Sequence, residues 1–257
     1  MNPIRIWAMA RHGFLELLRE RLLYLAGLFG VLLIAGAALI RQFTAVAEVK
    51  ILLDFGMGAI SLISLVIVLF TAPGLVGREI DKRTIHILVA KPISRAEFIV
   101  AKLLGLMAAL TLLVGVMAGL FMGFLTIARF PFPAGPLLVS WGFLMLELAL
   151  LTAAALLFSV FTSPLIATFL TLATFLIGHL SSDIVTLGRL VRNEQVVQFL
   201  RNLYLVVPDL SRLDLKNQAV YGVLPDGMTL ASNALYGSLY TLLLLSLTLM
   251  VFARREF

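Results

Sequence analysis

Residues 103–127 read LLGLMAALTLLVGVMAGLFMGFLTI and contain no charged side chain. A helix of about 20 apolar residues crosses the roughly 30 Å hydrocarbon core of a bilayer, so this run is long enough to span a membrane. The rest of the chain has a matching composition, because hydrophobic residues make up 61% of its 257 positions and charged residues only 13%. Soluble domains usually have about a quarter of their residues charged. The run therefore predicts an all-α integral membrane protein.

Five further apolar runs accompany this one, and each is a candidate membrane span. The fifth run in the chain is the shortest. It follows Thr162-Ser163-Pro164, which would end one helix and start the next with room only for a tight turn between them. We expect six transmembrane helices, at Leu22–Ile40, Phe55–Gly77, Leu103–Ile127, Leu137–Phe161, Leu165–Leu180 and Leu235–Ala253.

The distribution of Lys and Arg predicts the orientation. Most of these residues lie in the N-terminal segment, in loop 78–102 and at the C-terminus, whereas the short loops on the other side hold only Arg41, Lys50 and Arg129. Short loops rich in positive charge stay in the cytoplasm. We therefore expect both termini and loop 78–102 on the cytoplasmic side of a cell membrane. The formal charge of +6 then reflects this topology and the lipid head groups, and we do not expect nucleic-acid binding.

The chain is expected to form a single transmembrane domain, 1–257, with three features outside the spans, one of which is the cytoplasmic loop 78–102. Residues 1–21 have a polar stripe opposite an apolar one that includes Ile4, Trp7 and Phe14, which predicts a helix lying on the membrane surface. Residues 181–234 form a long outer loop, in which apolar residues at helical spacing predict an amphipathic helix. Whether this loop re-enters the membrane is left open by the sequence.

Residues for enzyme chemistry are not gathered in this sequence. There is no cysteine, and His12, His86 and His179 are predicted at different levels of the membrane, so that they cannot meet. None of the common metalloprotease, serine-hydrolase or nucleotide-binding motifs is present. We expect no catalytic residue, no metal site and no cofactor bound by this chain.

Glu147 is the acidic residue predicted near the middle of a span. An unpaired carboxylate there costs about 2.5–3.5 kcal/mol, so its side chain should face protein or water. Two roles are open: a protonated, hydrogen-bonded structural residue or one that lines a conduit. Because Glu147 lies about ten residues, or roughly 15 Å, below the outer end of its helix, His179 at the outer surface is not its expected partner.

Gly115, Gly119 and Gly123 are four residues apart and lie on one face of the third span. Small residues at this spacing let another helix approach closely. Packing within the chain is the favoured use, and contact with a second subunit is the alternative.

Residues 78–95, between the second and third spans, read REIDKRTIHILVAKPISR and are followed by Lys102. This pattern, with the basic helix before the first span, the six spans and the sequence VPDLS in the outer loop, resembles the ABC-type permeases of the second export class (ABC-2). Relatives include polysaccharide and drug exporters, and the chain is similar to permeases associated with multicopper-enzyme maturation. It departs from many relatives at Arg83, where they have glycine.

The resemblance implies a cytoplasmic coupling helix in loop 78–102 that docks on an ATPase. The residues to which this role is carried are Glu79, Asp81, Lys82, Arg83, Thr84, Leu88, Pro92 and Arg95. It also implies an exporter in which this permease pairs with a second copy or a close paralogue and with two cytoplasmic ATP-binding subunits, which would hold ATP and Mg. An ATP-independent secondary transporter or channel, and a membrane scaffold, are the alternatives.

Overall fold

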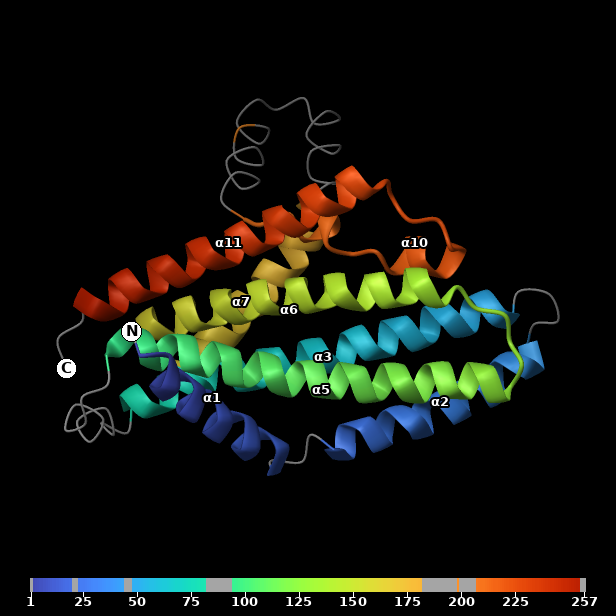
Figure 1. The fold of residues 1–257 in the computed structure, drawn as a ribbon, viewed down its shortest axis with the longest axis horizontal. Coiled ribbons are helices and arrows are strands. Elements are labelled where there is room, and N and C mark those ends of the chain that lie inside the picture. The colour runs from blue at the N-terminus through green and yellow to red at the C-terminus, as the bar shows by residue number, and fades with distance from the viewer. Residues whose placement is uncertain are drawn as a thin grey trace.

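The computed structural model describes residues 2–19, 23–43, 48–81, 94–181, 198 and 207–254, and every regular element within them is a helix (Figure 1). The all-helical prediction is therefore confirmed for the described residues. The elements are α1 (Pro3–Leu17), α2 (Leu23–Phe43), α3 (Glu48–Asp81), α5 (Arg95–Ile127), α6 (Ala134–Phe161), α7 (Pro164–His179), the short 3-10 helix η2 (Leu210–Arg212), α10 (Lys216–Tyr221) and α11 (Gly227–Arg254).

Among the described residues, four helices are long and apolar enough to cross a membrane, and their apolar stretches are Val49–Gly77, Ala96–Ile127, Ala134–Phe161 and Gly227–Ala253. Shorter apolar helices occupy Tyr24–Leu39 and Pro164–His179. All six predicted spans thus coincide with apolar helices, as a multi-pass membrane protein requires, and four of the six reach full spanning length.

The helix that contains the quoted run is longer than the sequence predicted, because it starts at Arg95 instead of Leu103. Its start is set by a capping box in which the Ser94 hydroxyl accepts from the Glu97 N–H, and the Glu97 carboxylate accepts from the Ser94 N–H. The segment that separates α3 from α5 is therefore restricted to 82–94.

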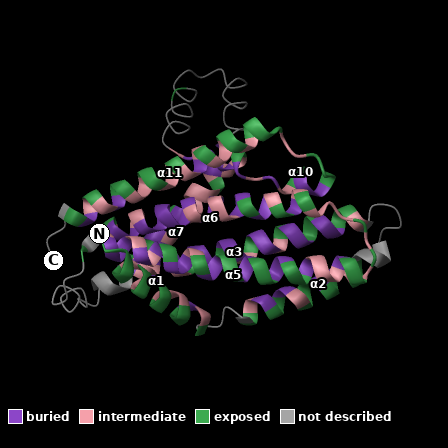
Figure 2. Ribbon diagram, in the orientation of Figure 1, coloured by how far each residue is buried: buried purple, intermediate pink, exposed green. Residues whose placement is uncertain are grey.

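Helix α6 is the centre of the bundle and is buried along most of its length (Figure 2). Helices α3, α5, α7, α10 and α11 all pack against it. Helix α11, by contrast, exposes a row of apolar side chains, including Leu235, Leu239 and Leu242. Such a face suits lipid or another protein better than water.

The helix ends are sorted between the two ends of the bundle. The first residues of α1, the end of α3, the start of α5 and the end of α11 lie together at one end (left in Figure 1). The end of α2, the start of α3, the turn between α5 and α6, and α10 lie toward the other end. This is the grouping that the predicted topology requires, although the side of the membrane stays a prediction.

Helix α1 lies across the first turns of α5. The Asn2 N–H donates to Glu97 Oε1 at 2.6 Å, and a Cβ added at Gly105 would lie 2.9 Å from the Ala10 carbonyl oxygen. Glycine at this position therefore permits the close approach of the two helix backbones. We call the contacts among Asn2, Ala10, Ser94, Glu97 and Gly105 the N-terminal clamp.

The residues that α1 buries against the rest of the protein are not those of the apolar stripe predicted to face the membrane, and that prediction stays untested. Ala10 and Leu17 are buried and Phe14 is partly buried, whereas Ile4 and Trp7 are largely exposed. Because α1 packs on α5, its small residue Ala10 takes the tightest contact, and its bulky residues lie at the surface, where a Trp suits a membrane interface.

Candidate functional site

Three of the eight predicted coupling residues are described, and they lie on helix turns at the end of the bundle that carries the N-terminal clamp. Glu79 and Asp81 lie on the last turn of α3, and Arg95 is the first residue of α5. Lys82, Arg83, Thr84, Leu88 and Pro92 lie outside the described residues, as does His86. The structure therefore places both ends of the predicted coupling segment at one end of the bundle.

The three glycines of α5 lie on an open face of the helix. No described atom outside their own helix lies within 4 Å of a Cβ added at Gly115, Gly119 or Gly123. The neighbours of α5 pack instead on its other side, through residues such as Met117 and Phe121. Among the described residues no helix packs on this face, and both predicted uses of the glycines, packing within the chain and contact with a second subunit, stay predictions.

Glu147, half way along α6, faces the protein interior, with its side chain only 2% exposed. Its Oε1 atom lies 3.6 Å from Nε2 of His179, the last residue of α7. The other imidazole nitrogen, Nδ1, lies 3.2 Å from the Phe175 carbonyl oxygen. Because a carbonyl can only accept, Nδ1 carries a hydrogen, and Nε2 is the atom that gains or loses a proton.

The expectation that Glu147 and His179 are far apart is wrong. Both helices extend from the same tight turn at Thr162-Ser163, and α7 has only 16 residues. Glu147 lies about 14 residues before that turn and His179 about 15 residues after its Pro164, so at 1.5 Å per residue both lie roughly 21–23 Å from it. The prediction placed the end of α7 level with the outer end of α6. In the structure α7 ends at the level of Glu147.

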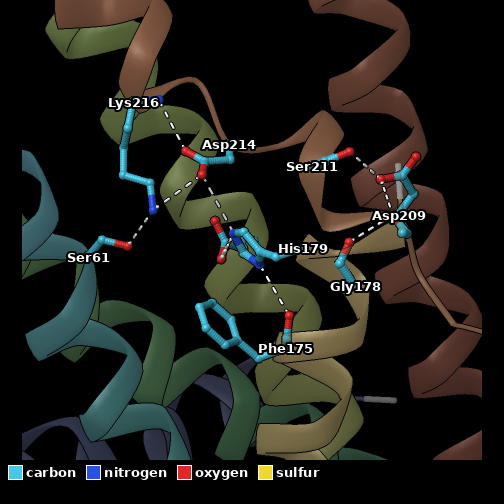
Figure 3. Close-up of polar contacts among 10 residues, drawn as sticks. Ser61, Phe175, Gly178, His179, Asp209, Ser211, Asp214 and Lys216 are labelled. Carbon is cyan, nitrogen blue, oxygen red and sulfur yellow. Dashed lines mark hydrogen bonds and ion pairs between the residues drawn. The ribbon is translucent and has the colours of Figure 1, made fainter. Parts of the chain in front are cut away.

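The space beside α6 beyond the end of α7 is filled by residues 207–221, which we call the cap segment. Its helix α10 packs on both α6 and α3. Asp214 Oδ2 lies 3.7 Å from His179 Nε2 and 3.4 Å from Lys216 Nζ, and the Lys216 ammonium donates to Ser61 Oγ of α3 at 3.2 Å (Figure 3). Glu147, His179, Asp214 and Lys216 form what we call the His179 cluster.

A small cavity adjoins this cluster. It is lined by Trp141, Glu147, Asp214 and Lys216, among other residues, and its volume is about 10 Å³, close to the smallest that holds a water molecule. The indole N–H of Trp141 is buried and has no hydrogen-bond partner among the described residues. The cavity is therefore polar on one side and suits a water or a proton better than an organic molecule.

A second polar group fastens the start of the cap segment to the end of α7. Asp209 Oδ1 accepts from the hydroxyls of Ser181, at 2.6 Å, and Ser211, and Arg212 Nε donates to Oδ2 at 3.1 Å. The backbone of the cap segment at Pro208 also passes close to Gly178 of α7, where an added Cβ would lie 2.8 Å from the Pro208 carbonyl oxygen.

The two aspartates of the cap segment are both stabilised as anions. Burial raises the pKa of Asp209, but hydrogen bonds from Ser181, Ser211 and Arg212 lower it by more, so the net pKa lies below its ordinary value. Burial likewise raises the pKa of Asp214, and the neighbouring His179 and Lys216 lower it by more. Both carboxylates are therefore ionised at neutral pH.

The chemistry available at the His179 cluster is binding and release of a proton. No group of His, Cys, Asp or Glu within the described ranges has the arrangement of a metal site, and the Lys216 ammonium already supplies a cation at Asp214. The sequence singled out Glu147 but missed Asp214, Lys216 and Ser61. Two features of the sequence could have indicated these residues. The span at 165–180 is too short to cross a membrane alone, and a charged Asp-Leu-Lys triplet follows at 214–216.

Comparison with known proteins gives one family. A search of curated proteins returned no match. The model of the ABC-2 family transporter proteins matches residues 7–257, nearly the whole chain. Most of the basic helix α1, the apolar helices and the cap segment lie within the matched range. This chain therefore belongs to the ABC-2 family of transporter proteins.

Proposed function

We propose that the protein is the membrane-spanning permease subunit of an ATP-driven exporter, and that it works as a dimer coupled to two separate ATP-binding subunits. The observation that carries this proposal is the family match over residues 7–257. Family members of this kind typically pair with ATP-binding subunits, and the sequence has no nucleotide-binding loop of its own.

The arrangement of the helices supports a place for the ATP-binding subunits. The ends of α3 and α5, which flank segment 82–94, lie at the same end of the bundle as α1. Through the N-terminal clamp, α1 is joined to the first turns of α5. A force applied by a partner to this segment would therefore act on α5 and α1 together.

The open glycine face of α5 supports a place for the second permease copy. Gly115, Gly119 and Gly123 leave a flat strip between exposed apolar side chains such as Val116 and Leu120. Small residues of this kind permit close helix contact between subunits in a membrane.

The likeness to permeases associated with multicopper-enzyme maturation stays a prediction, and the transported substrate is left open.

The test is to co-purify the protein with candidate ATP-binding subunits and measure hydrolysis and transport. Arg83→Glu and Leu88→Ala, in the predicted coupling segment, should weaken assembly or uncouple hydrolysis from transport while the protein still inserts. Arg129→Glu, an exposed change in the turn between α5 and α6, is the matched control and should have no effect. Transport without any bound ATPase would favour the secondary transporter, and assembly without transport the scaffold.

Topology can be tested separately because the chain has no cysteine. Single cysteines at Ser94 and Asn217 should react with an impermeant thiol reagent from the cytoplasmic and the outer side, respectively. Reaction of both from the same side would reject the proposed orientation.

A further inference from the structure

The His179 cluster has a charge balance that depends on a single proton. Glu147 and Asp214 bring two negative charges, and Lys216 brings one positive charge. When Nε2 of His179 is protonated, the four side chains sum to zero and the N–H has a carboxylate on either side, at 3.6 and 3.7 Å. When that proton is lost, a lone pair faces two carboxylates and the cluster carries a net negative charge.

Burial makes this imbalance unfavourable. Glu147 is almost fully enclosed, and the charges that act on Glu147 and His179 are each other's and those of Asp214 and Lys216. Helix α3 adds only the neutral Ser61 hydroxyl. Removing a charge partner from a buried group leaves an uncompensated charge, which is one of the more costly changes in a protein interior.

The proton lies among side chains from three segments of the chain. Glu147 and His179 belong to α6 and α7, whereas Asp214 and Lys216 belong to the cap segment. The cavity beside Trp141 reaches Glu147, Asp214 and Lys216, so a water molecule there could deliver or remove the proton.

We propose that the His179 cluster is a proton-binding site that fastens the cap segment to α6 and α7, and that loss of its proton releases this segment. The bound species is one proton shared between His179 and Glu147. The cap segment is held at neutral pH, where the charges balance, and loosens as the pH rises. This inference is independent of ATP coupling, because the groups that carry it all lie within one chain.

The test uses the absence of cysteine in the natural sequence. Ala219 of α10, within the cap segment, is fully buried, whereas Asn217, two residues earlier, is exposed. Ala219→Cys and Asn217→Cys are made singly in the full chain, reconstituted in lipid nanodiscs, and labelled with a small maleimide between about pH 6 and pH 9. The ratio of the two rates removes the common effect of pH on thiol reactivity.

The ratio should rise by about tenfold over this range as the cluster releases its proton. In the Glu147→Gln background the charges balance without a proton, so the ratio should stay low at every pH. In the His179→Gln background a negative charge is left over, so the ratio should be high already at neutral pH. The two variants thus shift the ratio in opposite directions, which a merely structural role would not produce.

A second readout covers the case in which Ala219→Cys does not fold. The chain has two tryptophans, so Trp7→Phe leaves Trp141, beside the cavity, as the only reporter. Quenching of its fluorescence by acrylamide should increase as the pH rises from about 6 to about 9. A labelling ratio and a quenching constant that do not change with pH, or a change of the same sign in both glutamine variants, would overturn the proposal.

Discussion

Glu97 and Glu147 are two nearly buried glutamates in neighbouring helices, and their surroundings could hardly differ more. Glu97, in the N-terminal clamp, is 4% exposed and accepts hydrogen bonds from the backbone N–H groups of Asn2 and Ser94. Glu147, in the His179 cluster, is 2% exposed and faces an imidazole at 3.6 Å, beyond hydrogen-bond length.

The two carboxylates differ in whether the groups that stabilise them can themselves gain or lose a proton. Backbone N–H groups do not titrate, so the N-terminal clamp holds α1 on α5 at any pH at which Glu97 is ionised. Asp214 and His179 both titrate, so the His179 cluster holds the cap segment only within a window of pH. A transporter that moves needs both rigid and releasable contacts, and the described residues include a contact of each kind.

The largest expected effect comes from removing the imidazole of the His179 cluster. His179→Leu leaves Glu147 and Asp214 with Lys216 as the only cation, and should lower the free energy of unfolding by about 3 kcal/mol. Thermal unfolding in detergent would measure this loss. His12→Leu is the matched control, because His12 on α1 is largely exposed and its change should stay within about 0.5 kcal/mol. Equal shifts in the two variants would show that the cluster is not a stabilising unit.

The next largest effect is expected at Gly105 in the N-terminal clamp and at Gly178 beside the cap segment, where two backbones approach closely. A Cβ at Gly105 would meet the Ala10 carbonyl, and a Cβ at Gly178 would meet the Pro208 carbonyl. Because both obstacles are backbone atoms, each glycine-to-alanine change should cost about 1–3 kcal/mol at neutral pH, and the cost at Gly178 alone should fall at alkaline pH, where the cap segment is released. Thermal unfolding at two pH values would check this.

Gly119→Ala is the control for both changes, since it lies on α5 with open space around it. In the monomer it should be neutral or stabilising by up to about 1 kcal/mol, because alanine favours a helix more than glycine does. If the same change weakens self-association, measured by sedimentation in detergent, the open glycine face is the dimer contact. A destabilised monomer would mean that this face is covered within the chain.

The sequence predicted the class and the six apolar helices because both follow from local composition. It missed the early start of α5 because Glu97 and Arg95 look like loop residues until the capping box of Ser94 is recognised. It also missed the meeting of Glu147 and His179, since this depends on the turn from which both helices are measured and on the length of α7.

The long-range parts of the cluster were harder to predict. Asp214 and Lys216 reach Glu147 only because the cap segment folds back along α6, and no periodicity in the outer loop specifies such a return. The motif VPDLS, noted for its resemblance, has a structural explanation: Asp209 and Ser211 bond each other, and Leu210 lies over Gly178.

A smaller effect should separate the clamp's hydrogen bonds from its packing. Glu97→Gln retains one side-chain oxygen and should keep α1 attached, whereas Glu97→Ala removes the acceptor of the Asn2 and Ser94 N–H groups. The alanine variant should therefore show faster hydrogen exchange at the first turn of α1, with little change in the cap segment. Faster exchange in both places would mean that the two regions are not independent.

The smallest effect expected is on the acid side of the cap segment, at Asp209. Since the pKa of Asp209 is lowered on folding, its contribution is fully present above the ordinary pKa of about 3.9 and is lost as the pH falls through the lower, folded value. This is opposite in sign to the His179 cluster, which should weaken as the pH rises. Asp209→Asn should therefore make stability depend less on pH in the acid range, by less than about 1 kcal/mol because Arg212 is partly exposed.

Ser211→Ala removes one hydrogen-bond donor to Asp209 and should move the midpoint of this acid limb of stability upward in pH. Thermal unfolding from about pH 3 to pH 7 would show both effects, and the labelling ratio at alkaline pH should be unchanged in both variants. If Asp209→Asn alters the alkaline limb as much as the acid limb, the cap segment is held by one coupled network instead of two separable attachments.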